Sequence, residues 1–104
     1  MVLQYREEAR FKRVSAKELK SICKDALDEL GWRYEVEDRW RIIAYVPYSV
    51  TSYGEWLIVD VFEEELVVVS HCRRRYQLVD WGKNRRNVDR FLTRVEDILD
   101  DDRR

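Results

Sequence analysis

Residues 55–73 read EWLIVDVFEEELVVVSHCR, which is two apolar runs joined by acidic residues. Runs of this length that are rich in valine and isoleucine predict two strands, Glu55–Phe62 and Glu65–Arg73, with a tight turn between them. The centres of both runs, Trp56–Val59 and Leu66–Val69, are apolar on both faces. A strand of this kind needs cover on both faces. One face should therefore meet helices, and the other a partner, a ligand or the long loops.

Upstream of this pair the apolar residues also recur at every second position. Trp32, Tyr34 and Val36 alternate with charged residues, and the same period runs through Trp40–Val46. These two segments predict a hairpin with an acidic turn. Pro47 cannot donate to a strand ladder and should end the second strand.

Two helices are predicted on either side of the four strands. Ser15 followed by Glu18 is a capping pair, and Gly31 supplies a left-handed C-cap, so the first helix should span Ala16–Leu30. The second should span Asn84–Leu99, with Asn84 as its N-cap. Its inner face is made of Val88, Phe91, Leu92, Val95, Ile98 and Leu99.

These elements predict a single α+β domain over residues 1–104. Its sheet is a four-stranded antiparallel β-meander flanked by an N-terminal and a C-terminal helix, in the order α-β-β-β-β-α, with both helices on one face. Residues 1–14 are expected to be a lead-in segment, and residues 100–104 a frayed, charged tail.

The composition narrows the possible partners and the compartment. Twenty basic and 21 acidic residues give a net charge of −1, which argues against a protein that mainly clamps nucleic acid. The chain has no apolar run of about 18 residues and begins with polar and charged residues, so we expect a cytoplasmic protein with no membrane contact. Cys23 and Cys72 are expected to be free thiols.

Catalytic and metal chemistry finds little support in the sequence. His71 and Cys72 are neighbours on a strand, so their side chains should point to opposite faces and cannot form a nucleophile–base pair. One His and two distant Cys do not make a usual zinc site. We therefore expect no catalytic residue, no metal and no cofactor.

Positive charge is concentrated where the last helix begins. Lys83, Arg85 and Arg86 lie at the end whose dipole is already positive, which costs about 0.3–1 kcal/mol for each cation unless something offsets it. A bound anion could do so, and the candidate residues are Arg73, Arg75, Asp80, Lys83, Asn84, Arg85 and Arg86. Ordinary surface ion pairs explain the same charges. Tyr76 and Trp81 lie among the arginines, which leaves single-stranded nucleic acid as a weaker alternative.

The leading hypothesis is a non-enzymatic binding or interaction module. The apolar residues on the second face of the strands would dock a protein partner or a second copy of the chain. The candidate interface residues are Ile43, Tyr45, Tyr48, Tyr53, Trp56 and Ile58. The anion pocket, for a small phosphate-like ligand, is the alternative.

A group of short motifs also resembles a known family. They are Ala26-Leu27, Leu30-Gly31-Trp32, Ile42-Ile43-Ala44 with Pro47 after it, Ser70, and Asp80-Trp81-Gly82-Lys83-Asn84-Arg85. Over residues 26–99 the chain resembles the bacterial domain-of-unknown-function family 1499. The family has a Ser-Arg step at the end of the strand before this motif. Counting back from Asp80, Arg75 stands in the place of that arginine and Arg74 in the place of the serine. The family has no established activity, so the resemblance implies a shared fold.

Overall fold

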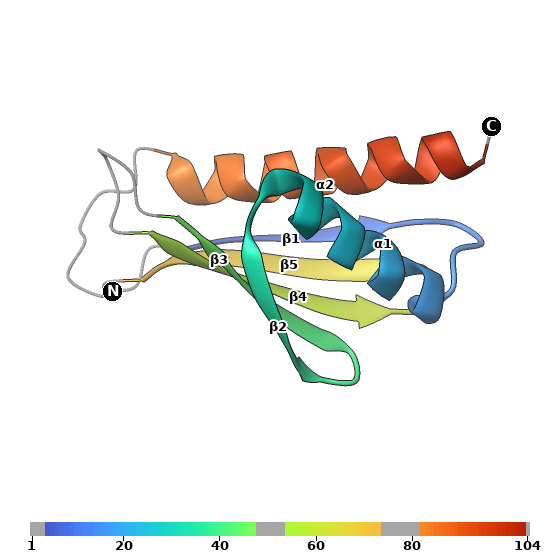
Figure 1. The fold of residues 1–104 in the computed structure, drawn as a ribbon, viewed down its shortest axis with the longest axis horizontal. Coiled ribbons are helices and arrows are strands. Elements are labelled where there is room, and N and C mark those ends of the chain that lie inside the picture. Colours follow the sequence, from blue (N-terminus) through green and yellow to red (C-terminus); the bar gives the residue numbers. More distant parts are fainter. Residues whose placement is uncertain (1–3, 48–53, 74–81, 104) are drawn as a thin grey trace.

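The computed structural model describes residues 4–47, 54–73 and 82–103, which form five strands and two helices (Figure 1). In chain order these elements are β1 (Gln4–Arg10), α1 (Ala16–Leu30), β2 (Arg33–Asp38), β3 (Arg41–Val46), β4 (Glu55–Phe62), β5 (Glu65–Cys72) and α2 (Lys83–Asp102). The predicted α+β class, with two helices and an antiparallel sheet, is confirmed.

The sheet has five strands, so the prediction of four was wrong. Its order is β1-β5-β4-β3-β2, with every neighbouring pair antiparallel and β4 in the centre. The additional strand, β1, lies within the expected lead-in and pairs with β5 from Gln4 opposite His71 to Arg10 opposite Glu65. Its sequence QYREEAR shows no alternation of apolar and polar residues. β1 is an edge strand in which every second side chain is exposed and none is fully buried.

Helix α1 begins and ends at the predicted residues. The Ser15 hydroxyl accepts a hydrogen bond from the Glu18 backbone N–H at 3.1 Å. Gly31 has φ 74°, and its N–H and that of Trp32 donate to the carbonyls of Asp28 and Leu27. This is the glycine-terminated helix end that the sequence predicts.

Helix α2 differs from its prediction at both ends. It begins at Lys83, and its N-cap is Gly82 in a left-handed conformation (φ 73°), not Asn84. Asn84 cannot act as the cap because it lies inside the first turn and is buried against the sheet. At the other end the helix continues to Asp102, so Asp100–Asp102 are helical rather than frayed.

One hydrophobic core joins the sheet to both helices. It contains Leu57 and Val59 of β4, Leu66 and Val68 of β5, and the buried faces of α1 and α2, which include Leu19 and Phe91. Helix α2 runs along the sheet beside β1 and β5, while α1 packs on α2 and reaches β4 (Figure 1). In the part of the chain that the structure describes, no helix is long and apolar enough to cross a membrane.

The capping contact of α1 can be tested by removing one hydroxyl. We expect Ser15→Ala to lower the free energy of unfolding by about 1 kcal/mol, because the Glu18 N–H loses its acceptor. Ser21→Ala is the matched control, since Ser21 is exposed in the middle of the same helix and alanine is the better helix former there. Urea unfolding followed by circular dichroism measures both. Equal effects of the two substitutions would contradict the capping role.

Candidate functional site

The two faces of the sheet differ in exposure. Along β4 and β5 every second residue is fully or almost fully buried, and the residues between them are partly exposed. We call the partly exposed side the open face. It carries Gln4, Arg6 and Glu8 of β1, Val67, Val69 and His71 of β5, Trp56, Ile58, Asp60 and Phe62 of β4, Arg41, Ile43 and Tyr45 of β3, and Arg33 and Glu35 of β2.

Strand register arranges the open face in three rows that cross the sheet. The apolar row, Val69–Ile58–Ile43, runs through the middle, with Arg6 at its β1 end and Glu35 at its β2 end. The aromatic row is His71–Trp56–Tyr45, between Gln4 and Arg33, and the charged row is Val67–Asp60–Arg41, between Glu8 and Asp38. The open face therefore has an apolar centre with charged side chains on both edge strands.

The aromatic row forms a structured depression with Arg73. The rings of Tyr45 and Trp56 meet edge to face, with centroids 5.4 Å apart and planes at 62°. Arg73 lies over the Tyr45 ring at 5.0 Å and donates to its hydroxyl at 2.6 Å. Together with Arg33 and Ile43 these side chains line a cavity of about 390 Å³. Aromatic and arginine side chains in such a depression are typical of protein interfaces.

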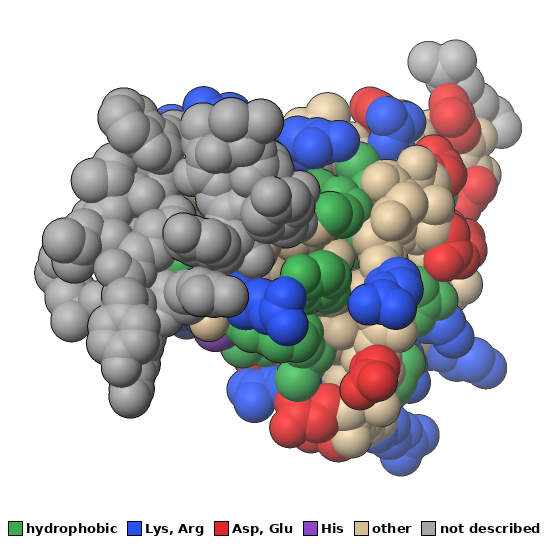
Figure 2. Space-filling view, turned by 60° about the vertical axis from the view of Figure 1, so that its left-hand side comes forward, with side chains coloured by type: hydrophobic (Ala, Val, Ile, Leu, Met, Phe, Trp, Pro, Cys, Tyr) green, Lys and Arg blue, Asp and Glu red, His purple; other side chains and the backbone are tan. Residues whose placement is uncertain are grey.

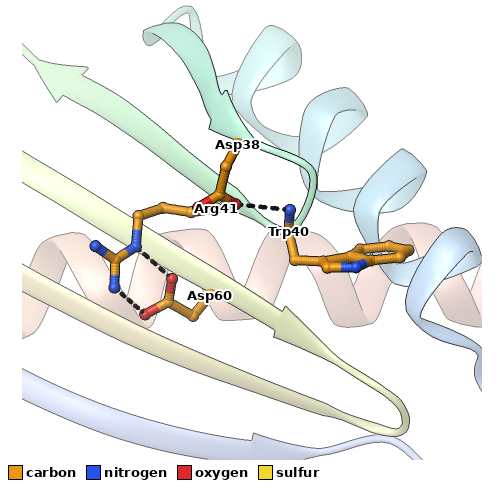
Figure 3. Close-up of polar contacts among 4 residues, drawn as sticks. All are labelled: Asp38, Trp40, Arg41 and Asp60. Carbon is orange, nitrogen blue, oxygen red and sulfur yellow. Dashed lines mark hydrogen bonds and ion pairs between the residues drawn. The ribbon is translucent and has the colours of Figure 1, made fainter.

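The charged row is neutralised within the sheet. Arg41 Nε and Nη2 donate to the two carboxylate oxygens of Asp60 at 2.6 and 3.0 Å, and this hydrogen bonding raises the pKa of Arg41. In Figure 3 the pair lies on the near side of the strands and α2 passes behind them. Asp38 accepts from the Trp40 N–H at 2.9 Å and closes the β2–β3 turn. A bidentate pair has a fixed geometry, so this end of the face is ordered.

Figure 2 shows one side of the molecule, where hydrophobic side chains lie next to basic and acidic ones.

Four of the predicted interface residues come together on the open face. Ile43, Tyr45, Trp56 and Ile58 are direct or diagonal neighbours on β3 and β4. Tyr48 and Tyr53 lie outside the described residues.

The predicted anion-site residues that the structure describes lie in different surroundings. Arg73 lies over Tyr45 on the open face. Arg85 lies 5.9 Å from the ring of Tyr5. Tyr5 is on the opposite face of the sheet, because its strand neighbour Ser70 is buried. Arg85 also lies 3.9 Å from Asp89. Arg86 is exposed, Lys83 is partly exposed, and Asn84 is buried. Arg75 and Asp80 lie outside the described residues, and the anion pocket stays a prediction.

A buried polar cluster joins the first turns of α2 to the sheet. Asn87 donates to Glu55 Oε1 at 2.6 Å and to Ser70 Oγ at 3.3 Å, and Ser70 donates to Asn84 Oδ1 at 2.9 Å. The Asn84 amide also reaches Cys72 Sγ at 3.5 Å. All five residues are buried. Asn87 Oδ1 has no hydrogen-bond partner among the described residues.

Sequence reasoning missed most of this cluster, although a signal was present. Glu55 shares a strand face with Leu57 and Val59, where the period of two predicts an apolar residue. Asn84 and Asn87 extend the apolar stripe of α2 toward its start. A charged residue on a buried strand face and two amides on the facing helix stripe predict a hydrogen-bonded cluster, because buried polar groups need partners.

His71 and Cys72 lie on opposite faces, as predicted. Cys72 is buried in the polar cluster, and His71 is on the open face, where its ring Nδ1 is 3.3 Å from the Cys72 carbonyl oxygen. Cys23 and Cys72 are not joined by a disulfide, and burial raises the pKa of the Cys23 thiol. Within residues 4–47, 54–73 and 82–103 no group of three or more His, Cys, Asp or Glu side chains is arranged to hold a metal.

No protein-family model, curated protein or solved structure matches this chain. The candidate function therefore depends on the geometry of the open face.

The buried cluster can be tested at its central amide. We expect Asn87→Ala to lower the free energy of unfolding by about 1–3 kcal/mol, because the donors to Glu55 and Ser70 are lost inside the protein. Glu96→Ala, at an exposed position of the same helix, should change it by less than about 0.5 kcal/mol. Chemical denaturation of both variants checks the difference, and a near-neutral Asn87→Ala would show that the cluster contributes little.

Proposed function

We propose that this chain is a non-enzymatic binding module that docks a protein on the open face of its sheet. The observation that carries the proposal is the apolar row Val69–Ile58–Ile43, which lies partly exposed at the centre of the face. When a partner removes such apolar surface from water, the free energy of the system falls by roughly 25 cal/mol for each Å² buried.

The proposal includes the placement of both helices on the face opposite the apolar row. Support comes from the core, because the buried side chains of β4 and β5 belong to one cluster with those of α1 and α2. The apolar stripes of the two helices are buried in that cluster. They are therefore not available to cover the open face, which stays partly exposed in the absence of a partner.

The edges of the sheet are poor alternatives for docking. The edge strand β1 carries four charged residues among seven, and β2 carries charges at four of six positions and a register shift between Val36 and Asp38. Charged residues and bulges on edge strands oppose the addition of another strand. The apolar centre of the open face has neither feature, so a partner should bind the face rather than an edge.

The chemistry of the open face suits binding better than catalysis. Arg41 is tied to Asp60, and Arg6 lies 2.8 Å from Glu8. Carboxylate oxygens occupied by arginine are poorly placed to exchange a proton with a substrate. The aromatic row instead offers large, rigid contact area, which favours recognition.

We place the module in the cytoplasm. The support is its two cysteines, which are buried and not bonded to each other. Buried cysteines that are not joined by a disulfide are typical of proteins in a reducing compartment.

Photo-crosslinking in living cells tests the docking face. We expect benzophenone side chains at positions 43 and 58 to give discrete crosslinked species, because both positions lie in the apolar row. A species supports the proposal only when Val69→Lys, a change in the same row, removes it while the circular dichroism spectrum is kept.

Two exposed positions away from the open face serve as controls. Val36 is 41% exposed and lies on the opposite side of the sheet, beside buried Ile42, while Glu96 is exposed on α2. Benzophenone at these positions should not give the same species. No crosslinked protein from either row position, or equal crosslinking from the controls, would contradict the proposed function.

A further inference from the structure

We propose that the partner on the open face is a second copy of this chain, docked face to face about a two-fold axis that runs parallel to β4. The inference rests on the proposed function and names its partner. It is carried by the charge pattern at the two ends of the apolar row, together with the position of β4 in the sheet.

The strand order allows this symmetry. β4 is the central strand, with β5 and β1 on one side and β3 and β2 on the other. A two-fold axis along β4, between two stacked sheets, places β5 over the partner's β3 and β1 over the partner's β2. Each row of one copy then lies over the same row of the other. Stacked sheets pack in this aligned way at about 10 Å, with strands about 30° apart.

The apolar row is complementary to itself under this operation. Ile58, on the axis, meets the partner's Ile58, and Val69 meets the partner's Ile43. In the aromatic row Trp56 meets the partner's Trp56. The contacts at the centre are therefore apolar or aromatic, as in the core of protein interfaces.

The ends of the apolar row decide the direction of the axis. Arg6 ends the row on β1 and Glu35 ends it on β2, so the proposed axis sets Arg6 opposite the partner's Glu35 twice in each dimer. An axis perpendicular to the strands would instead set Arg6 opposite the partner's Arg6. Like charges at such positions are destabilising, and opposite charges give specificity.

The other charges of the face lie toward its rim, and one pair of them is unfavourable. Arg6 pairs with Glu8 in the single copy, but both side chains are about half exposed (52% and 53%), and an exposed pair of this kind contributes only about 0–1 kcal/mol. Gln4 lies opposite the partner's Arg33, so the Gln4 amide oxygen can accept a hydrogen bond from that guanidinium. Glu8 opposite the partner's Asp38 is unfavourable, and solvent screens it at the rim.

The size of the face predicts a weak dimer. Five strands at about 4.8 Å spacing and four alternate residues along β4 make a face of about 24 by 20 Å, or on the order of 500 Å². Stable complexes bury about 800 Å² on each partner. Association should therefore be measured over a concentration series that reaches the highest soluble concentration.

A charge-swap experiment tests both the partner and the axis. Sedimentation velocity at low salt should show concentration-dependent dimers of the wild-type chain. Arg6→Glu and Glu35→Arg should each weaken dimerisation by about tenfold or more, because each creates two like-charge contacts. An equal mixture of the two variants should recover it, since both contacts between the unlike copies are then of opposite sign.

Arg85→Glu is the matched control. It gives the chain the same net charge as Arg6→Glu, but it lies on α2, where Arg85 is 71% exposed, and it should leave dimerisation unchanged. A mixture that dimerises no better than the single variants would overturn the two-fold arrangement, as would single variants that dimerise like the wild type.

Symmetric thiol crosslinking adds a second readout. Ile58→Cys should be joined to its own copy by a bifunctional thiol reagent with a spacer of about 10 Å, because position 58 meets its own copy across sheets stacked at that distance. Val36→Cys, exposed on the other side of the sheet, should not be joined. A chain that stays monomeric at every concentration overturns the second-copy inference. If photo-crosslinking at positions 43 and 58 still captures another protein, the proposed function stands while this inference fails.

Discussion

The structure depends on one constraint, which is that strands β4 and β5 are apolar on both sides. Because neighbouring side chains point to opposite faces, Leu57 and Val68 enter the core while Ile58 and Val69 face away from it. The buried side chains of the two amphipathic helices belong to the same core as Leu57 and Val68. The apolar row on the second side is left partly exposed, and the proposed docking follows from that imbalance.

Local sequence signals were sufficient for the elements with strong periodicity. The capping contact of Ser15, the left-handed Gly31 and the alternation in β3, β4 and β5 could all be predicted, because each depends on residues close in sequence. Strand β1 could not, because QYREEAR is held by its ladder with β5, about sixty residues further along the chain. Its position depends on tertiary pairing rather than on local propensity.

The start of α2 shows the same limit for the candidate site. Asparagine is a common helix-capping residue. The Asn84 amide instead accepts a hydrogen bond from Ser70 and donates one to Cys72 in the interior. The neighbouring Asn87 holds Glu55 on a strand that is distant in sequence. These bonds set the position of α2 on the sheet, since displacing the helix would leave buried polar groups unpaired. Only the three-dimensional arrangement distinguishes this use of asparagine from capping.

The central strand also shows how a face can be suited to meeting its own copy. Any residue on a two-fold axis lies opposite itself, so an isolated charge there would repel its duplicate. Along the open side of β4, Trp56, Ile58 and Phe62 carry no charge. The remaining residue, Asp60, is bound at both carboxylate oxygens by Arg41 of the adjacent strand, and the pair is neutral as a unit. On the edge strands the axis brings Arg6 and Glu35 together with opposite signs, whereas the like-charged Glu8 and Asp38 meet at the exposed rim.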